Sequence, residues 1–219
     1  MFNLALISVP AAPLSSEDSV GFALQIFEDL RLTHWPVVDE GIFKGLISEE
    51  TLLDAEEQLL IKDLASEFLP YSVLADEYFM TAVRIVTERR LDLVAVISPD
   101  GEYHGIITKS ELLQRMAAFS GIHTPGGLLV LEVSPHDYSP GEISRLIETN
   151  NAQLTQLNTA YDPATGLYHV IIRINKQEIS DIIATFQRYD YRVLYFAGEE
   201  QYENELKRNF HHFLHFLEM

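Results

Sequence analysis

Two short segments of the chain place a hydroxyl residue in the same pattern. One reads Gly-Leu-Ile-Ser and ends at Ser48, and the other reads Gly-Ile-Ile-Thr and ends at Thr108. Each hydroxyl follows an apolar run and precedes a helical pattern, so free backbone N–H groups that can meet a phosphate are expected beside it. Three residues after Thr108 stands Glu111, whose carboxylate can accept hydrogen bonds from ligand hydroxyls, whereas Thr51 stands three residues after Ser48.

A helix cap explains the same residues without a ligand. Thr108 as the N-cap and Glu111 as the third helical residue would form a capping box, in which each side chain bonds to the other's backbone N–H. The same account suits Ser48 with Thr51, where no acid is present. The residues by themselves therefore leave a ligand site and a helix cap open as interpretations.

A phosphate site also needs cations. The candidate cations are Arg89, Arg90 and Lys109 for the segment that ends at Thr108, and Arg31 and Lys44 for the segment that ends at Ser48. Arginine at a helix end equally complements the helix dipole, which is the alternative for the first two. His34 and His104 lie beside the predicted strands and complete the set of candidate ligand-binding residues.

The two segments belong to an internal repeat of about sixty residues. Residues 36–53 read PVVDEGIFKGLISEETLL, and residues 95–113 read AVISPDGEYHGIITKSELL. Repeats of this period are copies of one supersecondary unit that pack on each other. In copy one the pattern predicts a helix over 20–32, strands over 35–39 and 43–47, and a helix over 49–60. In copy two it predicts an extended segment over 73–76, a helix over 78–90, strands over 93–97 and 103–107, and a helix over 110–119.

The repeated pattern resembles the CBS domain, named after cystathionine β-synthase. The matching residues are Trp35-Pro36-Val37-Val38-Asp39 and Gly45-Leu46-Ile47-Ser48 in copy one, and Val94-Ala95-Val96-Ile97 and Gly105-Ile106-Ile107-Thr108 in copy two. The resemblance covers residues 1–120, with copy one at about 1–61 and copy two at about 62–120. It implies a paired module that binds AMP, ADP, ATP, S-adenosylmethionine or a related adenosine compound between the repeats, with the acid on the ribose hydroxyls. Glu111 replaces the usual Asp of this pattern, and Thr51 departs from it.

The chain after the linker at 120–127 has a different order of elements. The pattern predicts strands over 128–133, 154–161, 168–174 and 192–196, and helices over 140–150 and 176–188. This βαββαβ order predicts a ferredoxin-like sandwich over 127–198. Through the segment Asp137-Tyr138-Ser139-Pro140-Gly141-Glu142-Ile143 it resembles the ACT domain, a fold often used to sense amino acids, which makes Asp137, Gly141 and Asn150 candidates for a second site. A CBS pair followed by an ACT-like unit is similar to the layout of the acetoin-utilisation family of regulators.

Residues 199–219 have the pattern of a further amphipathic helix. Its apolar positions are Tyr202, Leu206, Phe210, Phe213, Leu214 and Leu217, which predicts a packing or dimer surface. His211 and His215 have the spacing of a helical metal-binding pair, but no His-Glu-x-x-His motif accompanies them. No metal site is therefore expected.

The composition argues against several classes of function. A net charge of −18 disfavours nucleic acid and anionic membranes as partners. The absence of cysteine excludes disulfides, zinc fingers and thiol catalysis. The first residues lack the basic region of a signal peptide, and no apolar run approaches the roughly 18 residues of a transmembrane helix, so a cytoplasmic protein is expected. Without a nucleophile elbow, a Walker loop or a dinucleotide fingerprint, neither catalytic residues nor a required cofactor are expected.

These observations predict an α+β regulatory protein that is not an enzyme, built from a CBS pair, an ACT-like unit and a C-terminal helix. A ligand would favour one relative orientation of the repeats, and the C-terminal unit or an unknown protein target would respond to it. A homodimer is expected, because paired CBS modules commonly associate. The alternative is a ligand-free scaffold in which the repeats only dimerise, favoured by Thr51 and by the negative charge.

Overall fold

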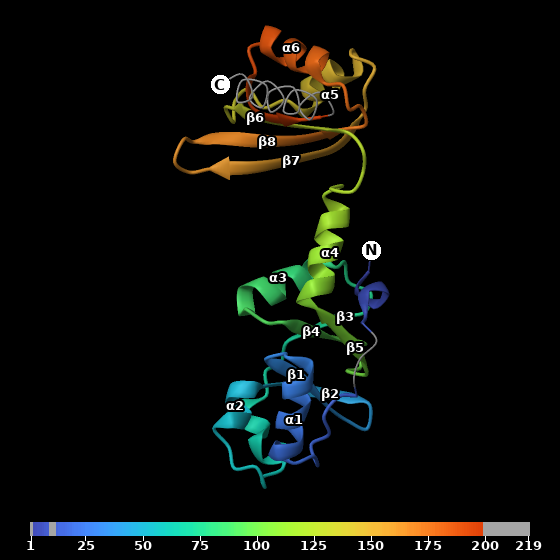
Figure 1. The fold of residues 1–219 in the computed structure, drawn as a ribbon, viewed down its shortest axis with the longest axis vertical. Coiled ribbons are helices and arrows are strands. Elements are labelled where there is room, and N and C mark those ends of the chain that lie inside the picture. The colour runs from blue at the N-terminus through green and yellow to red at the C-terminus, as the bar shows by residue number, and fades with distance from the viewer. Residues whose placement is uncertain (1, 9–11, 199–219) are drawn as a thin grey trace, which may run out of the picture. The chain divides into compact units, whose positions relative to one another are not determined.

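The computed structural model describes residues 2–8 and 12–198, and the chain divides into two compact units, residues 1–116 and 117–219 (Figure 1). The first unit contains both copies of the repeat. The second contains a separate α+β sandwich. The helix predicted over 199–219 lies outside the described residues. No helix in the described ranges is both long enough and apolar enough to cross a membrane.

Copy one folds as a helix, a hairpin and a short helix. Its elements are α1 (Val20–Leu30), β1 (His34–Asp39), β2 (Ile42–Ser48), α2 (Glu49–Leu53) and the 3₁₀ helix η2 (Ile61–Glu67). Ser19 caps α1 by accepting a hydrogen bond from the backbone N–H of Phe22. Glu40 and Gly41 turn the hairpin with positive φ angles of 52° and 79°, as a tight two-residue turn between twisted strands requires.

The second helix of copy one is shorter than the sequence pattern predicts. The predicted helix over 49–60 ends at Leu53, and Asp54 is its C-cap. The next residues instead bind the start of α1, where the N–H groups of Val20 and Gly21 donate to the carbonyls of Leu59 and Glu57 at 2.9 and 3.0 Å. The first N–H groups of a helix have no partner within it, so a segment of turns that satisfies them is favoured over a longer α2.

Copy two repeats this path. Its elements are β3 (Ser72–Leu74), α3 (Met80–Arg89), β4 (Leu93–Ile97), β5 (Tyr103–Thr108) and α4 (Lys109–Phe119). β3 pairs in parallel with β4, and β4 pairs antiparallel with β5. In copy one the place of β3 is taken by a single parallel bridge between Leu14 and Val37. The hairpins and first helices therefore match the predicted repeat.

The two hairpins bind each other through repeat-related positions. The N–H of Phe43 donates to the carbonyl of Gly101 at 3.0 Å, and the N–H of Tyr103 donates to the carbonyl of Gly41 at 2.8 Å. Such an exchange is the signature of a two-fold relation, here between two copies within one chain. Side chains from both copies form one hydrophobic core, which includes Trp35, Val37, Leu46, Leu93, Val94 and Ile107.

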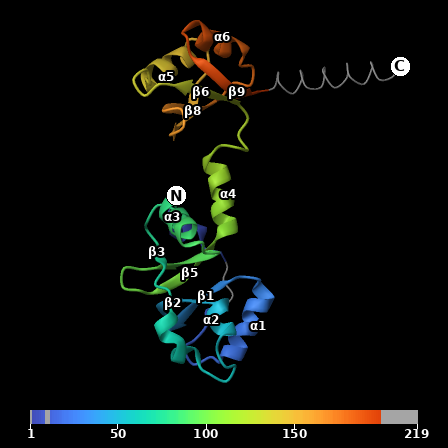
Figure 2. The same ribbon diagram turned by 90° about the vertical axis from the view of Figure 1, so that its left-hand side faces the viewer.

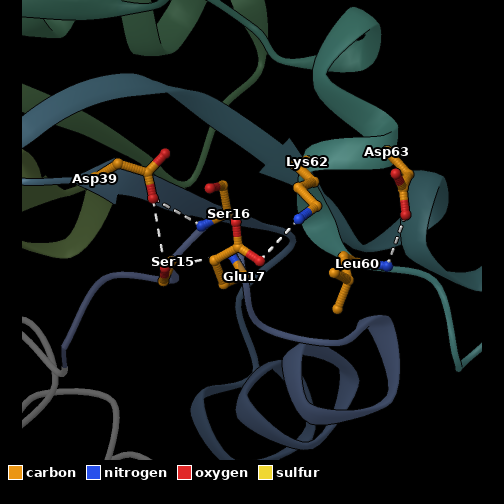
Figure 3. Close-up of polar contacts among 7 residues, drawn as sticks. All are labelled: Ser15, Ser16, Glu17, Asp39, Leu60, Lys62 and Asp63. Atoms are coloured by element: carbon orange, nitrogen blue, oxygen red, sulfur yellow. Dashed lines mark hydrogen bonds and ion pairs between the residues drawn. The ribbon is translucent and has the colours of Figure 1, made fainter.

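The acid of the Pro-Val-Val-Asp motif binds the segment that precedes α1. Asp39 accepts hydrogen bonds from the backbone N–H of Ser16 at 2.9 Å and from the hydroxyl of Ser15 at 3.4 Å (Figure 3). Burial alone would raise the pKa of the Asp39 carboxyl, but these hydrogen bonds outweigh it and lower the pKa. Nearby, Lys62 of η2 pairs with Glu17 at 2.8 Å. Residues 15–17, which precede α1, are therefore bound by both β1 and η2.

The second unit is a four-stranded antiparallel sheet covered on one face by two helices (Figure 2). Its elements are β6 (Gly127–Val133), α5 (Pro140–Glu148), β7 (Leu154–Asp162), β8 (Leu167–Ile174), α6 (Ser180–Arg188) and β9 (Arg192–Ala197). The strand order β7-β8-β6-β9 is that of the predicted ferredoxin-like sandwich. Alternate residues of β6 and β8 are buried beneath α5 and α6.

The helix α6 begins at Ser180, four positions later than predicted. The segment before it passes close to the ends of two strands. A Cβ atom on Gly127 would lie 2.9 Å from the carbonyl oxygen of Lys176, and one on Gly198 would lie 2.4 Å from that of Gln177. Residues 176–179 therefore pass these glycines as an irregular segment, and the helix starts only beyond this contact.

Candidate functional site

The hydroxyl and the acid of copy two meet at the start of α4. Glu111 Oε2 accepts hydrogen bonds from the N–H and the Oγ1 of Thr108 at 3.2 and 3.3 Å, and the N–H of Glu111 donates to Thr108 Oγ1 at 3.3 Å. This is the reciprocal arrangement of a capping box. The hydroxyl of Ser8 donates to the same carboxylate oxygen. Within the described ranges no hydrogen bond involves Glu111 Oε1, so one carboxylate oxygen retains its acceptor capacity.

A groove of about 360 Å³ lies beside this carboxylate. Ala5, Leu6 and Ile7 of the N-terminal segment form one wall, and Glu111, Gln114 and Arg115 of α4 form the other. Small-molecule sites in proteins usually enclose roughly 300–1,000 Å³, so the groove has the size of a small ligand. It offers a carboxylate, an amide and a guanidinium beside the N-terminal segment, which together can bind a polar molecule.

The N-terminal segment is held against copy two at several points. The buried side chain of Asn3 donates to the carbonyl of Leu74 at 2.9 Å, and the N–H of Ser8 donates to the carbonyl of Ile106 at 3.0 Å. Between them, Ile7 packs against Gly105, where an added Cβ would lie 2.5 Å from Ile7 Cγ2. A side chain at position 105 would therefore displace the wall of the groove.

The matching groove of copy one has a different chemistry. The repeat places Thr51 where copy two has Glu111, Asp54 where it has Gln114, and Ala55 where it has Arg115. This groove, of about 640 Å³, is lined by Glu50, Thr51, Asp54, Ala55, Glu56, Leu59, Leu64 and Glu67. Its lining therefore contains acids and apolar residues, with no base to attract an anion.

The start of α2 is capped by hydroxyls alone. Ser48 Oγ accepts from the N–H of Thr51 at 3.1 Å, and the two hydroxyl oxygens lie 2.7 Å apart. Ser48 also shares a second groove of about 400 Å³ with His34. The imidazole Nδ1 of His34 lies 2.9 Å from the hydroxyl of Thr33, which lines the same groove, and 3.7 Å from the carboxylate of Asp92 in copy two.

The predicted cations do not line the groove beside Glu111. The guanidinium of Arg89 lies over the ring of Tyr71, 5.1 Å from its centroid. Arg90 is the left-handed C-cap of α3, with φ of 56°. Lys109, at the start of α4, and His104, on β5, are exposed and are absent from the groove lining.

Arg115 is the groove residue that the sequence analysis missed. It lies four residues after Glu111, a spacing that places two side chains on the same face of a helix. Within residues 2–8 and 12–198, its guanidinium makes neither an ion pair nor a hydrogen bond. The i,i+4 spacing from Glu111 was the signal that could have identified it.

In the second unit, the candidates Asp137 and Asn150 are at opposite ends of α5. Asp137 accepts a hydrogen bond from the hydroxyl of Ser134 at 2.7 Å, which lowers the pKa of its carboxyl. Asn150 donates to the carbonyl of Leu146 at 2.8 Å and to the hydroxyl of Thr185 at 3.2 Å, so it ties α5 to α6. These two candidates therefore do not form one site.

A shallow pocket of about 310 Å³ adjoins Asp137 and is rich in acids. Its lining residues are Glu132, Val133, Ser134, Asp137, Glu142, Tyr189, Asp190 and Tyr191. Burial, followed by the hydrogen bond that Tyr191 donates to Glu142 at 3.0 Å, raises the pKa of Tyr191 to about 12. The candidate Gly141 does not line this pocket, and an added Cβ there would meet nothing within 4 Å. Among the described residues, no cluster of three or more side chains is arranged to hold a metal ion.

The model of the CBS domain family matches residues 6–58 and 61–118, together more than half of the chain. A CBS domain pair/ACT domain protein from Thermotoga maritima has a similar structure, with a TM-score of 0.50 and 16% identity, over 54% of this chain and 98% of that one. A conserved protein from Geobacillus kaustophilus aligns at a TM-score of 0.47 with 22% identity, over 54% of this chain and 98% of that one. At this level of identity the first likeness concerns the fold alone.

Proposed function

Because the chain belongs to the CBS domain family, whose modules are generally regulatory rather than catalytic, we propose that it senses a small adenosine-containing molecule. The ligand would bind beside Glu111 in copy two. The observation that carries this proposal is the groove of about 360 Å³, which is lined by both Glu111 and Arg115 and by the N-terminal segment. AMP, ADP, ATP and S-adenosylmethionine are the compounds that this proposal covers.

In this proposal Glu111 receives the ribose hydroxyls. One of its oxygens already serves the cap at Thr108, and the other, Oε1, is free to accept from a ligand. The hydroxyl of Ser8 donates to the other oxygen of this carboxylate, Oε2. A bound ribose and Ser8 would therefore divide the acceptor capacity of Glu111 between them.

We infer from this shared carboxylate how binding is transmitted. Ser8 belongs to the segment that is fixed to copy two at residues 2–8 and rejoins copy one at Leu14, whose N–H donates to the carbonyl of Pro36 at 2.9 Å. A ligand that weakens the Ser8 contact would act on the chain that connects the copies. The result would be a shift between two arrangements of the pair, governed by the difference in ligand affinity between them.

Further parts of the proposal concern partners and location. We propose a cytoplasmic, non-enzymatic homodimer that binds neither nucleic acid nor membrane, consistent with the net charge of −18. Leu53 and Leu113 occupy matched positions in α2 and α4 and are 67% and 71% exposed. A pair of exposed leucines related by the repeat suits a symmetric contact with a second copy.

A ligand-free scaffold is the second candidate function. Its support is the capping box itself, because Thr108 and Glu111 satisfy each other's N–H groups without any ligand. In this case the acid would serve helix stability alone. Truncating Glu111 would then lower thermal stability and change nothing else.

Isothermal titration calorimetry with AMP, ADP, ATP and S-adenosylmethionine distinguishes the sensor from the ligand-free scaffold. We expect heat with at least one compound, and its loss in Glu111→Ala. Glu88→Ala is the matched control, because Glu88 is an exposed acid on α3 whose ion-pair partner is Arg84, at 3.7 Å. Absence of heat and of a thermal shift with every compound would exclude the sensor and favour the scaffold.

A further inference from the structure

We propose that the groove beside Glu111 selects adenosine compounds that carry a single anionic group, and that Arg115 determines this specificity. This inference rests on the proposed function and goes beyond it. It names the charge class of the ligand and the residue that discriminates it. A nucleoside 5′-monophosphate fits this class, whereas nucleoside di- and triphosphates do not.

The two charged residues of the groove are spaced so that one ligand can reach both. Glu111 and Arg115 both line the groove and are four residues apart on α4. Side chains at this spacing are neighbours, with Cβ atoms about 5–6 Å apart. A ribose bound at Glu111 would therefore place its 5′ substituent within reach of the guanidinium, since the two ends of a ribose phosphate are separated by a similar span.

The guanidinium of Arg115 is available to bind an anionic group of the ligand. Glu111 directs its bonded oxygen toward Thr108 and Ser8, and it forms no ion pair with Arg115. Glu111 is the one acid among the described residues that line the groove. Within the described residues the guanidinium is thus an uncompensated cation, and a planar guanidinium can hold a phosphate with two parallel hydrogen bonds.

The lack of further bases sets the upper limit on ligand charge. Arg115 is the single base among the residues that line the groove. Lys109 begins the same helix, but it is exposed and does not belong to the lining. Each additional phosphate would add negative charge to a chain of net charge −18 without a new cation to bind it.

Copy one has residues without positive charge at the matching positions. Ala55 replaces Arg115, Thr51 replaces Glu111, and the lining acids include Glu50, Asp54 and Glu67. An anionic ligand would meet repulsion there and would find no ribose acceptor. The inference therefore includes one binding site per chain, located in copy two.

The test is a calorimetric series with adenosine, AMP, ADP and ATP at fixed ionic strength and without added divalent cations. For the wild-type chain we expect AMP to bind roughly ten- to a hundredfold more tightly than adenosine, the range of a hydrogen-bonded charge pair. ADP and ATP are expected to bind more weakly than AMP. In Arg115→Gln the affinity ratio of AMP to adenosine should fall to about one, and Arg115→Lys should restore part of it.

Arg84→Gln is the matched control, since Arg84 is an exposed arginine of α3 whose partner is Glu88. It should keep the wild-type ratio. Equal binding of AMP and adenosine to the wild type, tighter binding of ATP than of AMP, or an unchanged ratio in Arg115→Gln would overturn the inference while leaving the proposed function intact. Absence of binding by all four compounds, and by S-adenosylmethionine, would instead overturn the proposed function and this inference with it.

Discussion

Copy one and copy two both run from a hairpin into a helix, but different residues cap the two helices. In copy one, Ser48 and Thr51 close the start of α2 with two hydroxyls. In copy two, Thr108 and Glu111 close the start of α4 with a hydroxyl and a carboxylate, and Ser8 adds a third partner. Either pair caps a helix, so the fold does not require the acid. What the acid adds is charge and acceptor capacity beside a groove.

The two copies also differ in how they build the shared core. Trp35 of copy one and Val94 of copy two occupy matched strand positions and are both buried. The larger side chain is in the copy that lacks the acid. Copy one therefore contributes more packing at this position and less site chemistry, which suggests a division of roles that mutations can test.

The largest expected effect comes from Trp35→Ala. The indole is 2% exposed, and its Nε1–H donates to the carbonyl of Ala12 at 3.1 Å. Removing a buried tryptophan costs about 3–5 kcal/mol of unfolding free energy, whereas Val94→Ala should cost about 2 kcal/mol. Urea unfolding followed by circular dichroism measures both. An equal or larger loss for Val94→Ala would contradict the greater contribution of copy one.

Gly45→Ala is expected to cause the next largest loss of stability. Gly45 has φ of +155°, and an added Cβ would lie 2.7 Å from Cβ of Phe68, an atom fixed to the backbone. We expect a loss of about 2–3 kcal/mol from overpacking and backbone strain. Gly105→Ala should cost less stability, because it meets the side-chain methyl of Ile7. Thermal unfolding compares the two variants, and a larger loss for Gly105→Ala would show that Ile7 cannot adjust.

The pH dependence of stability distinguishes the copies at a third position. Asp39 has a lowered pKa, whereas the matched residue in copy two is Ser98, which does not titrate. A carboxyl whose pKa is lower in the folded chain stabilises it above the unfolded pKa of about 3.9, and this contribution is lost as the pH falls. In Asp39→Asn the slope of unfolding free energy against pH should therefore be smaller between about pH 3 and 5. An unchanged slope would mean that Asp39 contributes nothing to the acid sensitivity.

Thr51→Glu gives the smallest effect and the sharpest comparison. It supplies the acid that copy one lacks and should complete a capping box with Ser48, for a gain of up to about 1 kcal/mol. It should not create a second ligand site, because Ala55 remains where copy two has Arg115. Differential scanning calorimetry and the binding stoichiometry measure the two outcomes. A second bound ligand would show that the acid alone is sufficient.

Much of the fold follows from local sequence signals. The Pro99-Asp100-Gly101 and Glu40-Gly41 turns, the alternation in the strands and the order βαββαβ identify most elements, because these signals depend on neighbouring residues. The end of α2 at Leu53 and the start of α6 at Ser180 were predicted wrongly. Both depend on distant contacts, of residues 57–60 with α1 and of residues 176–179 with strand-end glycines.

The site was less accessible from the sequence than the fold. The pairing of Thr108 with Glu111 is a local feature and was recognised. The partnership of Glu111 with Ser8 joins residues far apart in the chain, and no local pattern indicates it. The position after the first helix of copy two favoured Arg89 and Arg90 as phosphate-binding cations, but the guanidinium of Arg89 stacks on Tyr71. The direction of a long side chain is set by its neighbours in space, which one sequence does not reveal.

The central claim is that copy two holds the ligand site and copy one does not. The most direct test is a titration of the ¹⁵N-labelled chain with AMP, followed by amide chemical shifts. The account predicts that the largest changes fall on residues 5–8 and 108–115, which form and border the groove beside Glu111, with little change at residues 48–55. Changes centred on 48–55, or no change at saturating AMP, would contradict it.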